Sequence, residues 1–267
     1  MRGSPLRFAV VLALPVAPLC GCVTALPGSF SEDFESGDGY LTADFPDDPR
    51  LALVAGEGVG GTRAMRATYV GGPTGSDGFA FDIPLARPAV EYTLSYAVRF
   101  EPGFQFVHGG KLPGLGPARP VTGGEPLTPE GWSARVMWRD GGRAELYVYH
   151  QDQPGTYGEP GAGESAAYFV PGRWHSVSLQ VRVNAPAASA NGAVVLYVDG
   201  ELVDRHDNLR LRATEGANGL VSNLLFHTFH GGHGPEWAPR EPDGSFATVH
   251  ALFDNIAVLQ ARTRAAR

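Results

Sequence analysis

The chain has 267 residues, with 21 Lys and Arg against 28 Asp and Glu, and its net charge is −7 at pH 7. This acidic balance argues against nucleic acid as the main partner, and any polyanionic ligand would need a local cationic patch. Hydrophobic residues make up 43% of the chain, which is enough for one large packed domain. The only lysine is Lys111, and the 20 other basic residues are arginine. Lys111 is therefore a candidate for chemistry that a guanidinium cannot perform.

Residues 1–22 predict an export signal. Two arginines precede an apolar run that is too short to span a membrane as a mature helix. The run ends in Leu-Cys-Gly-Cys, which resembles a bacterial lipobox with Cys22 as the lipidated residue, although Cys20 departs from the usual small or aliphatic residue. Ordinary cleavage after Ala25 is the alternative. We expect an exported protein, attached to the membrane only through a lipid on Cys22, with residues 23–28 as a short tether.

Period-2 alternation predicts one all-β domain over residues 29–260, followed by a short tail at 261–267. Both cysteines lie in the export segment, so the domain has no disulfide. Many short strands without a long amphipathic helix favour a two-sheet antiparallel β-jelly-roll sandwich, with one sheet face free to line a groove. In chain order, the predicted strands are 64–70, 78–83, 91–100, 132–139, 144–150, 173–183, 193–198, 201–203, 220–229 and 247–259.

Two neighbouring strands, 132–139 and 144–150, carry the richest chemistry. If Trp132 and the other apolar residues of its face enter the core, Ser133 and Arg135 share the opposite face with Tyr147 and Tyr149. A three-residue loop at 140–142 would pair Arg135 with Tyr147 and Ser133 with Tyr149, whereas a two-residue loop would split the polar residues between faces. Paired side chains lie about 5 Å apart at Cβ, so the longer loop predicts a compact polar cluster.

This cluster suits β-elimination from a polyuronate. The reaction must neutralise the C5 carboxylate, remove the C5 proton and protonate the departing O4. Nearby Arg135 and Lys111 would neutralise the carboxylate and lower the pKa of a tyrosine, which then acts as base. No metal or other cofactor is required. The alternative is that the tyrosines are ordinary strand aromatics, Arg135 a surface charge and Lys111 a solvated lysine in a glycine-rich turn.

Short motifs follow one another in order along the chain, namely Gly-Gly-Lys-Leu-Pro-Gly at 109–114, Trp-Ser-Ala-Arg-Val-Met-Trp-Arg at 132–139, Leu-Tyr-Val-Tyr-His at 146–150, Pro-Gly-Arg-Trp-His at 171–175, Val-Asp-Gly at 198–200, Thr-Phe-His-Gly-Gly at 228–232, Trp-Ala-Pro at 237–239 and Phe-Asp-Asn at 253–255. On these motifs the chain resembles polysaccharide lyase family 14, the alginate lyase group, and is similar to the glucuronan lyases of family 20. The resemblance implies a jelly roll with a substrate groove on its concave sheet and an anionic polysaccharide as partner. It also assigns the catalytic site to Lys111, Ser133, Arg135, Tyr147 and Tyr149. One departure is His230, where the resemblance leads us to expect a second aromatic beside Phe229.

Several further residues are candidates for substrate binding. Gln105 and His108 lie near Lys111 in the chain and are expected to contact sugar, and Arg139 and Tyr157 are candidate rim contacts. His227, His230 and His233 are spaced as a metal triad, but on a strand 227 and 230 face opposite ways, so we predict groove or core histidines and no metal. His150 has core-side parity and is interpreted as structural.

We therefore expect an exported lyase in which Arg135 and Lys111 hold the carboxylate, Tyr147 and Tyr149 serve as acid and base in an order left open, and Ser133 orients the sugar. A non-catalytic glycan-binding module on the same sandwich is the alternative. A hydrolase would need paired carboxylates, and Glu145 is the only acid near the tyrosines.

Overall fold

The computed structural model describes residues 29–36, 41, 48–161 and 168–261. Residues 1–28, which include the predicted lipobox at Cys22 and the tether, lie outside the described residues, as do positions 262–267 of the predicted tail. None of the helices in the described ranges has the length and hydrophobicity of a membrane span. The strands of these ranges are β1 (Phe30–Glu32), β2 (Leu51–Ala55), β3 (Arg63–Gly72), β4 (Gly75–Ser76), β5 (Phe79–Ala89), β6 (Glu91–Phe100), β7 (Gly109–Gly116), β8 (Ser133–Arg139), β9 (Ala144–Tyr149), β10 (His175–Arg182), β11 (Gly192–Val198), β12 (Glu201–Leu209), β13 (Val221–His230) and β14 (Thr248–Gln260).

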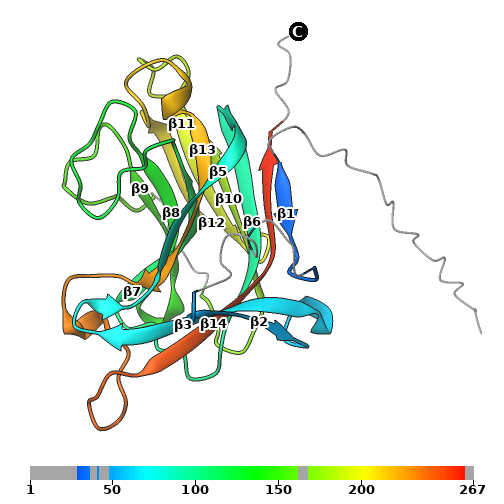
Figure 1. Ribbon diagram of the computed structural model, residues 1–267. Helices are drawn as coiled ribbons and strands as arrows, with labels where there is room; N and C mark the ends of the chain where they lie inside the picture. The colour runs from blue at the N-terminus through cyan, green and yellow to red at the C-terminus, as the bar shows by residue number, and fades with distance from the viewer. Residues whose placement is uncertain (1–28, 37–40, 42–47, 162–167, 262–267) are drawn as a thin grey trace, which may run out of the picture.

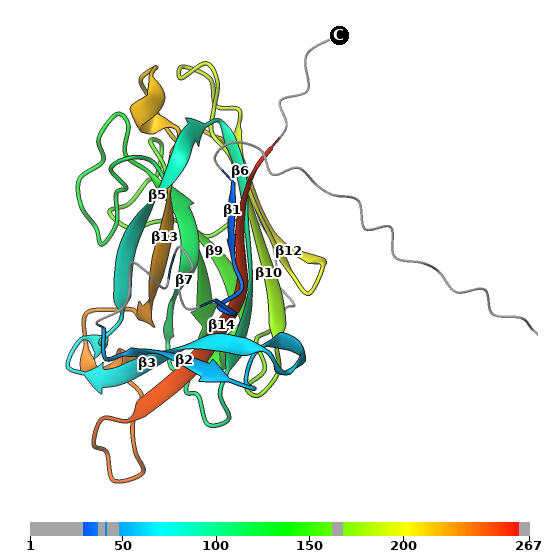
Figure 2. The same cartoon turned by 45° about the vertical axis from the view of Figure 1, so that its right-hand side comes forward.

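The strands form two antiparallel sheets packed face to face (Figure 1), as the alternation predicts. The larger sheet has the order β12-β11-β10-β6-β14-β3-β2, with β1 on β14 and β4 on β3. The smaller sheet has the order β5-β13-β7-β8-β9. In both views β2, β3 and the first part of β14 cross at the lower end of the sandwich (Figures 1 and 2). The architecture is the jelly-roll sandwich expected from the sequence.

The core between the sheets is apolar and rich in aromatic rings. The predicted inward set of β8 and its flank, from Trp132 to Trp138, is fully buried there. Phe100 of β6 lies at the centre of an aromatic cluster, 5.4 Å from Trp138 and 4.5 Å from Phe104 between ring centroids. Edge-to-face and tilted ring pairs of this kind add to the energy of apolar burial. Since one face of the smaller sheet is committed to this core, its other face is free to carry the polar residues.

Strand β7 is the main correction to the predicted elements. The sequence predicts a turn around Lys111, yet residues 109–116 form the central strand of the smaller sheet, between β13 and β8. Its glycines are there because neighbouring groups leave no room for a side chain. A Cβ on Gly110 would lie 2.1 Å from the Trp138 ring, and one on Gly114 would lie 2.1 Å from the Ala134 carbonyl oxygen. Lys111 is thus held on a rigid strand.

Candidate active site

The hairpin of β8 and β9 has the register predicted from alternation. Arg135 lies opposite Tyr147, and Ser133 lies opposite Tyr149. Residues 140–142 form the predicted three-residue loop, in which Gly142 has a φ of +86°. A positive φ is readily adopted only by glycine, so this residue lets the loop close without shifting the register.

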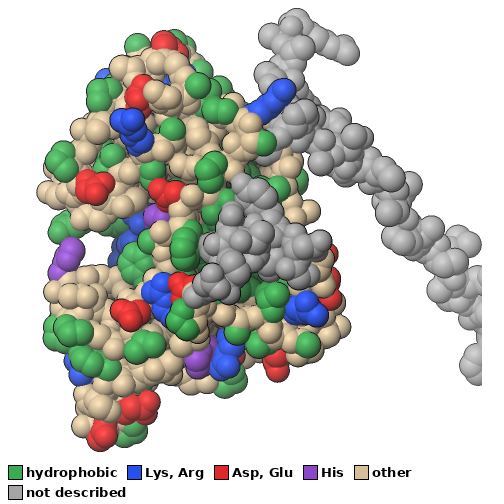
Figure 3. Space-filling model, in the orientation of Figure 1, with side chains coloured by type: hydrophobic (Ala, Val, Ile, Leu, Met, Phe, Trp, Pro, Cys, Tyr) green, Lys and Arg blue, Asp and Glu red, His purple; other side chains and the backbone are tan. Residues whose placement is uncertain are grey.

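Of these four side chains, Arg135, Tyr147 and Tyr149 line a cavity of about 400 Å³ on the outer face of the smaller sheet. Lys111, Arg135, Arg139, Tyr147 and Tyr149 contribute from β7, β8 and β9. The segments 122–123, 157–158 and 231–237 cover the cavity from the sides. Figure 3 shows a hollow at the left side of the molecule that is bordered by cationic and histidine side chains. The site is therefore a partly enclosed cavity and not an open sheet face.

Arg135 forms the floor of this cavity. Its side chain is fully buried, with the residue only 2% exposed, and its Nε and one terminal nitrogen, Nη2, have no hydrogen-bond partner among the described residues. Burial lowers the pKa of the guanidinium to about 10, which still leaves it protonated at neutral pH. A buried cation with two unused donors is a site for a planar anion such as a carboxylate.

Lys111 lies above the same floor. Its Nζ donates a hydrogen bond to Met137 Sδ at 3.1 Å and lies 3.8 Å from the centroid of the Tyr147 ring. Burial, followed by the nearby charges of Arg135 and Arg139, holds the pKa of Lys111 well below its ordinary value. The single lysine of the chain is thus placed where its amine loses a proton more readily than in water.

Tyr147 and Tyr149 lie edge to face, with ring centroids 5.7 Å apart. We expected the nearby cations to lower the pKa of a tyrosine, but the pKa of Tyr147 is raised to about 12. Burial and the hydrogen bond with Tyr149 outweigh the opposing charges of Arg135 and Arg139. The expectation is wrong for Tyr147 because the desolvation that strengthens the cations also disfavours the phenolate.

The hydroxyl of Tyr149 is fixed from outside the sheet. Its oxygen accepts a hydrogen bond from the Gly124 backbone N–H at 3.0 Å. Ser133, which we expected to orient the sugar, is fully buried, does not line the cavity, and donates its hydroxyl to the Val121 carbonyl at 2.8 Å. Ser133 therefore holds the segment that supplies the Gly124 amide, and it acts through that segment and not by contact with the cavity.

Arg139 lies at the edge of the cavity and is held by Glu145. The two side chains form an ion pair of 2.5 Å, and Glu145 also pairs with Arg143 at 2.6 Å. Glu145 is the only acid that the sequence placed near the tyrosines, and these contacts commit it to two arginines. Among the described residues, no carboxylate lines the cavity, whereas a hydrolase would use a pair of them.

The structure places the other predicted substrate-binding residues in different environments. Gln105 binds the backbone of Arg240 through both ends of its amide, at 2.8 and 2.9 Å, and does not line the cavity. His230 is 1% exposed and faces the core, stacked on Phe104, because 230 has the opposite parity to Phe229. Burial lowers its pKa to about 4. Gln105 and His230 thus lie outside the cavity lining, and a substrate contact by either stays a prediction.

Two histidines lie nearer the cavity without lining it. His227 is on the same face of β13 as Phe229 and pairs with Asp82 at 2.8 Å. His108 is exposed and contacts Trp237, with ring centroids 5.4 Å apart. Trp237 lines the cavity, so His108 is connected to the cavity through its contact with that indole.

The sequence reasoning missed several residues of the cavity wall. Met137 shares the parity of Arg135 on β8, which is the signal that could have identified it. Phe229 and Trp237 present apolar faces to the cavity. Tyr157, a predicted rim contact, and His233, expected in the groove or core, both line the cavity and meet through a hydrogen bond of 3.2 Å. What the sequence could not show is their contact with each other, because 76 residues separate them in the chain.

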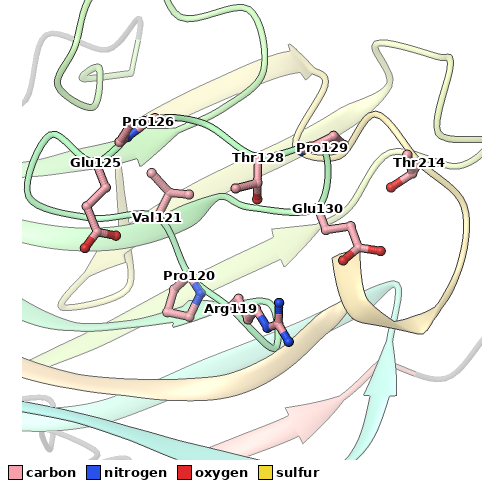
Figure 4. Close-up of a pocket in the computed structure, with 9 residues that line it drawn as sticks. All are labelled: Arg119, Pro120, Val121, Glu125, Pro126, Thr128, Pro129, Glu130 and Thr214. Carbon is pink, nitrogen blue, oxygen red and sulfur yellow. The ribbon is translucent and has the colours of Figure 1, made fainter.

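A second cavity, of about 360 Å³, lies around the segment 119–130 (Figure 4). Its charged lining residues are Arg119, Glu125 and Glu130. One cation between two carboxylates gives this cavity a negative balance, and no tyrosine lines it. An anionic ligand is therefore expected at the cavity of Arg135 and not here.

The model of the family Polysaccharide lyase 14 matches residues 60–255. Among solved structures, the alginate lyase Aly36B is 24% identical, with a TM-score of 0.69 over 90% of this chain and 100% of that chain. The marine PL-14 alginate lyase from Aplysia kurodai is also 24% identical, with a TM-score of 0.63 over 87% and 98% of the two chains. The endo-beta-1,4-glucuronan lyase of the fungus Trichoderma reesei is 18% identical, with a TM-score of 0.53 over 80% and 89%. A comparison with curated proteins finds no match.

The solved structures share the jelly-roll fold with this chain. The family match covers most of the chain and contains every residue that lines the cavity of Arg135. It confirms the resemblance first based on short motifs along the sequence. The chain belongs to polysaccharide lyase family 14.

Proposed function

We propose that this polysaccharide lyase cleaves a 1,4-linked polyuronate of the alginate or glucuronan kind by β-elimination, without a metal ion in the reaction, and leaves an unsaturated uronate end. The observation that carries the proposal is the buried Arg135 guanidinium, with two unused donors, beside Tyr147, Tyr149 and Lys111 in one cavity. A lectin needs no such set of proton-transfer groups beside an anion site.

The carboxylate of the reacting sugar binds Arg135 in this mechanism. Removal of the C5 proton transfers charge onto the carboxylate, which then resembles an enolate dianion. The two free donors of Arg135 become stronger hydrogen-bond partners as this charge develops, so they stabilise the transition state more than the ground state. Lys111 adds a second group whose charge depends on pH. These protein cations supply the neutralisation that a metal supplies in other sites.

The two tyrosines divide the proton transfers. Tyr149 takes the C5 proton, since the Gly124 amide that donates to its oxygen stabilises negative charge there. The electrons of the C5–H bond form the C4=C5 double bond, and the C4–O4 bond breaks. Tyr147 gives its proton to O4, because a hydroxyl with a pKa of about 12 is protonated before the reaction. A proton returned from Tyr149 to Tyr147, whose ring centroids are 5.7 Å apart, restores both groups.

The placement of both tyrosines on one side of the cavity favours sugars with H5 and O4 on the same side. Mannuronate and glucuronate meet this condition, whereas guluronate, inverted at C5, would need groups on opposite faces. Solved neighbours are described as alginate lyases, one of them in complex with an alginate tetrasaccharide, and as a glucuronan lyase. We therefore propose polymannuronate and polyglucuronate as the preferred substrates.

The test is to incubate the protein separately with polymannuronate, polyguluronate and polyglucuronate and to follow the ultraviolet absorbance of unsaturated ends. New absorbance on the first and third, and much slower release from polyguluronate, is the expected result. Binding to these polymers without new absorbance would instead identify a glycan-binding module. Reducing ends without unsaturation would identify a hydrolase.

We also propose that the protein is exported and carries a lipid on Cys22. The support is the sequence alone, namely the basic start, the short apolar run and the Leu-Cys-Gly-Cys ending. Labelled palmitate should enter the wild-type protein and not Cys22→Ala. Equal labelling of the two, or release of the wild-type protein without a lipid, would favour ordinary signal cleavage.

A further inference from the structure

A cluster of two imidazoles and one carboxylate lies outside the catalytic cavity. His150 follows the last residue of β9, Glu159 belongs to the segment that pairs with β9, and His206 lies on β12. One ligand atom of each lies within 4.8 Å of the others, and His150 Nε2 and Glu159 Oε2 are 2.7 Å apart. The rings of His150 and His206 meet edge to face at 5.2 Å. Three groups that bind metals in their neutral or anionic forms thus converge from distant positions.

The cluster has binding capacity that the protein does not use. His150 is 5% exposed, and the Nδ1 atoms of both His150 and His206 are buried without a hydrogen-bond partner among the described residues. Buried polar atoms of this kind normally have a hydrogen-bond partner or a ligand, since leaving one unpaired is unfavourable.

We propose that His150, Glu159 and His206 bind a zinc ion. Two imidazole nitrogens and one carboxylate are a donor set that zinc takes, whereas calcium and magnesium take six or more oxygens. Ligand atoms at 2.0–2.1 Å from a tetrahedral ion are about 3.3 Å apart, and the spread of this cluster needs only small side-chain movements to reach that spacing. The remaining coordination position is taken by water.

The position of the cluster indicates what the ion would stabilise. β9 and β12 are edge strands, one from each sheet, so an ion between them links the two sheets at the open side of the sandwich. The backbone of Glu159 pairs with Val148, with hydrogen bonds of 2.8 and 2.9 Å. Two residues earlier, Tyr157 lines the catalytic cavity. Zinc would therefore fix the segment that carries one cavity wall, without taking part in the reaction.

The experiment uses the full chain, purified without a histidine tag and stripped with a chelator. Zinc is titrated against a chromophoric chelator, cobalt is added separately to record visible d–d bands, and the unfolding temperature is measured with zinc and with calcium. The variants are Glu159→Gln and His206→Gln. The control is His250→Gln, which changes another partly buried histidine that hydrogen-bonds Thr68 on the larger sheet.

The expected result is one zinc per chain in the wild type and in His250→Gln, with the cobalt bands of a four-coordinate site and an unfolding temperature raised by zinc and not by calcium. Affinity should fall more than about tenfold in Glu159→Gln and His206→Gln. Wild-type affinity no greater than that of either variant would overturn the proposal, as would an equal shift with calcium. Glu159→Gln keeps the test valid if His206→Gln does not fold. Lyase activity enters none of these measurements, so failure here leaves the proposed reaction untouched.

Discussion

Replacing Arg135 should separate activity from stability. Arg135→Met removes the cation, and Arg135→Lys keeps the positive charge but lacks the paired N–H donors of the guanidinium. Hydrogen bonds to a charged group contribute about 1.5–3 kcal/mol each, so the two unused donors are worth about 3–6 kcal/mol to a bound carboxylate. This corresponds to a fall in kcat/KM of roughly a hundredfold to ten-thousandfold in Arg135→Met. Arg135→Lys should lose about half of that free energy, since one donor remains.

Stability should change in the opposite direction. At pH 7 the guanidinium is protonated in both the folded and the unfolded chain, so the fall of its pKa from 12.5 to about 10 costs the folded state about 3 kcal/mol. Arg135→Met removes this cost and loses part of the packing of the arginine stem. A net gain of about 1–2 kcal/mol raises the unfolding temperature by a few degrees in a domain of this size.

The assay combines initial rates of unsaturated-end formation with thermal unfolding of the same preparations. Arg205→Met is the control, because Arg205 is an exposed arginine on the larger sheet that pairs with Asp207. It should keep wild-type kcat/KM. Full activity in Arg135→Lys would refute the two-donor binding of the carboxylate. Loss of activity together with a lower unfolding temperature in Arg135→Met would refute the claim that the buried charge opposes folding.

Three other substitutions test the rest of the cavity. Between the lowered pKa of Lys111 and about pH 10.5, the unfolded wild type binds more protons than the folded protein, so its free energy of unfolding should rise with pH. Urea unfolding of Lys111→Met should not show this rise. Tyr147→Phe should lower kcat by about 10²–10⁴ with little change in KM, measured on polymannuronate, and unchanged kcat would exclude it as the acid. Gly232→Ala should raise KM, because φ is +127° and the new Cβ would lie 2.2 Å from the Trp237 ring; an unchanged KM would remove Trp237 from the binding surface.

The β8–β9 hairpin was predictable because alternation and loop parity depend only on local sequence. An even loop would have placed Arg135 and Tyr147 on opposite faces, so the requirement of one polar face selected the register that the structure has. The same alternation gave the inward set from Trp132 to Trp138. Where a strand has one buried face, the alternation of apolar and polar residues indicates which face that is.

β7 could not be predicted in this way, since its glycines and proline are typical of turns. The reason for Gly110 is the Trp138 ring packed against it, a contact between two strands that no single segment reveals. The burial of Ser133 and Tyr149 was missed for a related reason. The segment that covers them, and whose Val121 and Gly124 bind them, has no periodic pattern, so nothing in the sequence placed it over the sheet.

The cationic floor of the cavity is where we propose that this acidic protein binds a polyanion. Lys111, Arg135 and Arg139 gather at one face, and Glu145 pairs with Arg139 but with neither of the other two. Arg135 is buried with two donors unpaired among the described residues, and burial together with this nearby charge lowers the pKa of Lys111. A carboxylate that enters relieves this unfavourable state, so part of its binding free energy is stored in the folded protein before substrate arrives. The carboxylate of the ligand would neutralise the Arg135 guanidinium. Saturating oligouronate should therefore raise the unfolding temperature of the wild type more than that of Arg135→Met, which lacks this buried cation. The only lysine of the chain therefore lies in a site where, in the proposed mechanism, the cost of burying positive charge is offset when the substrate carboxylate binds.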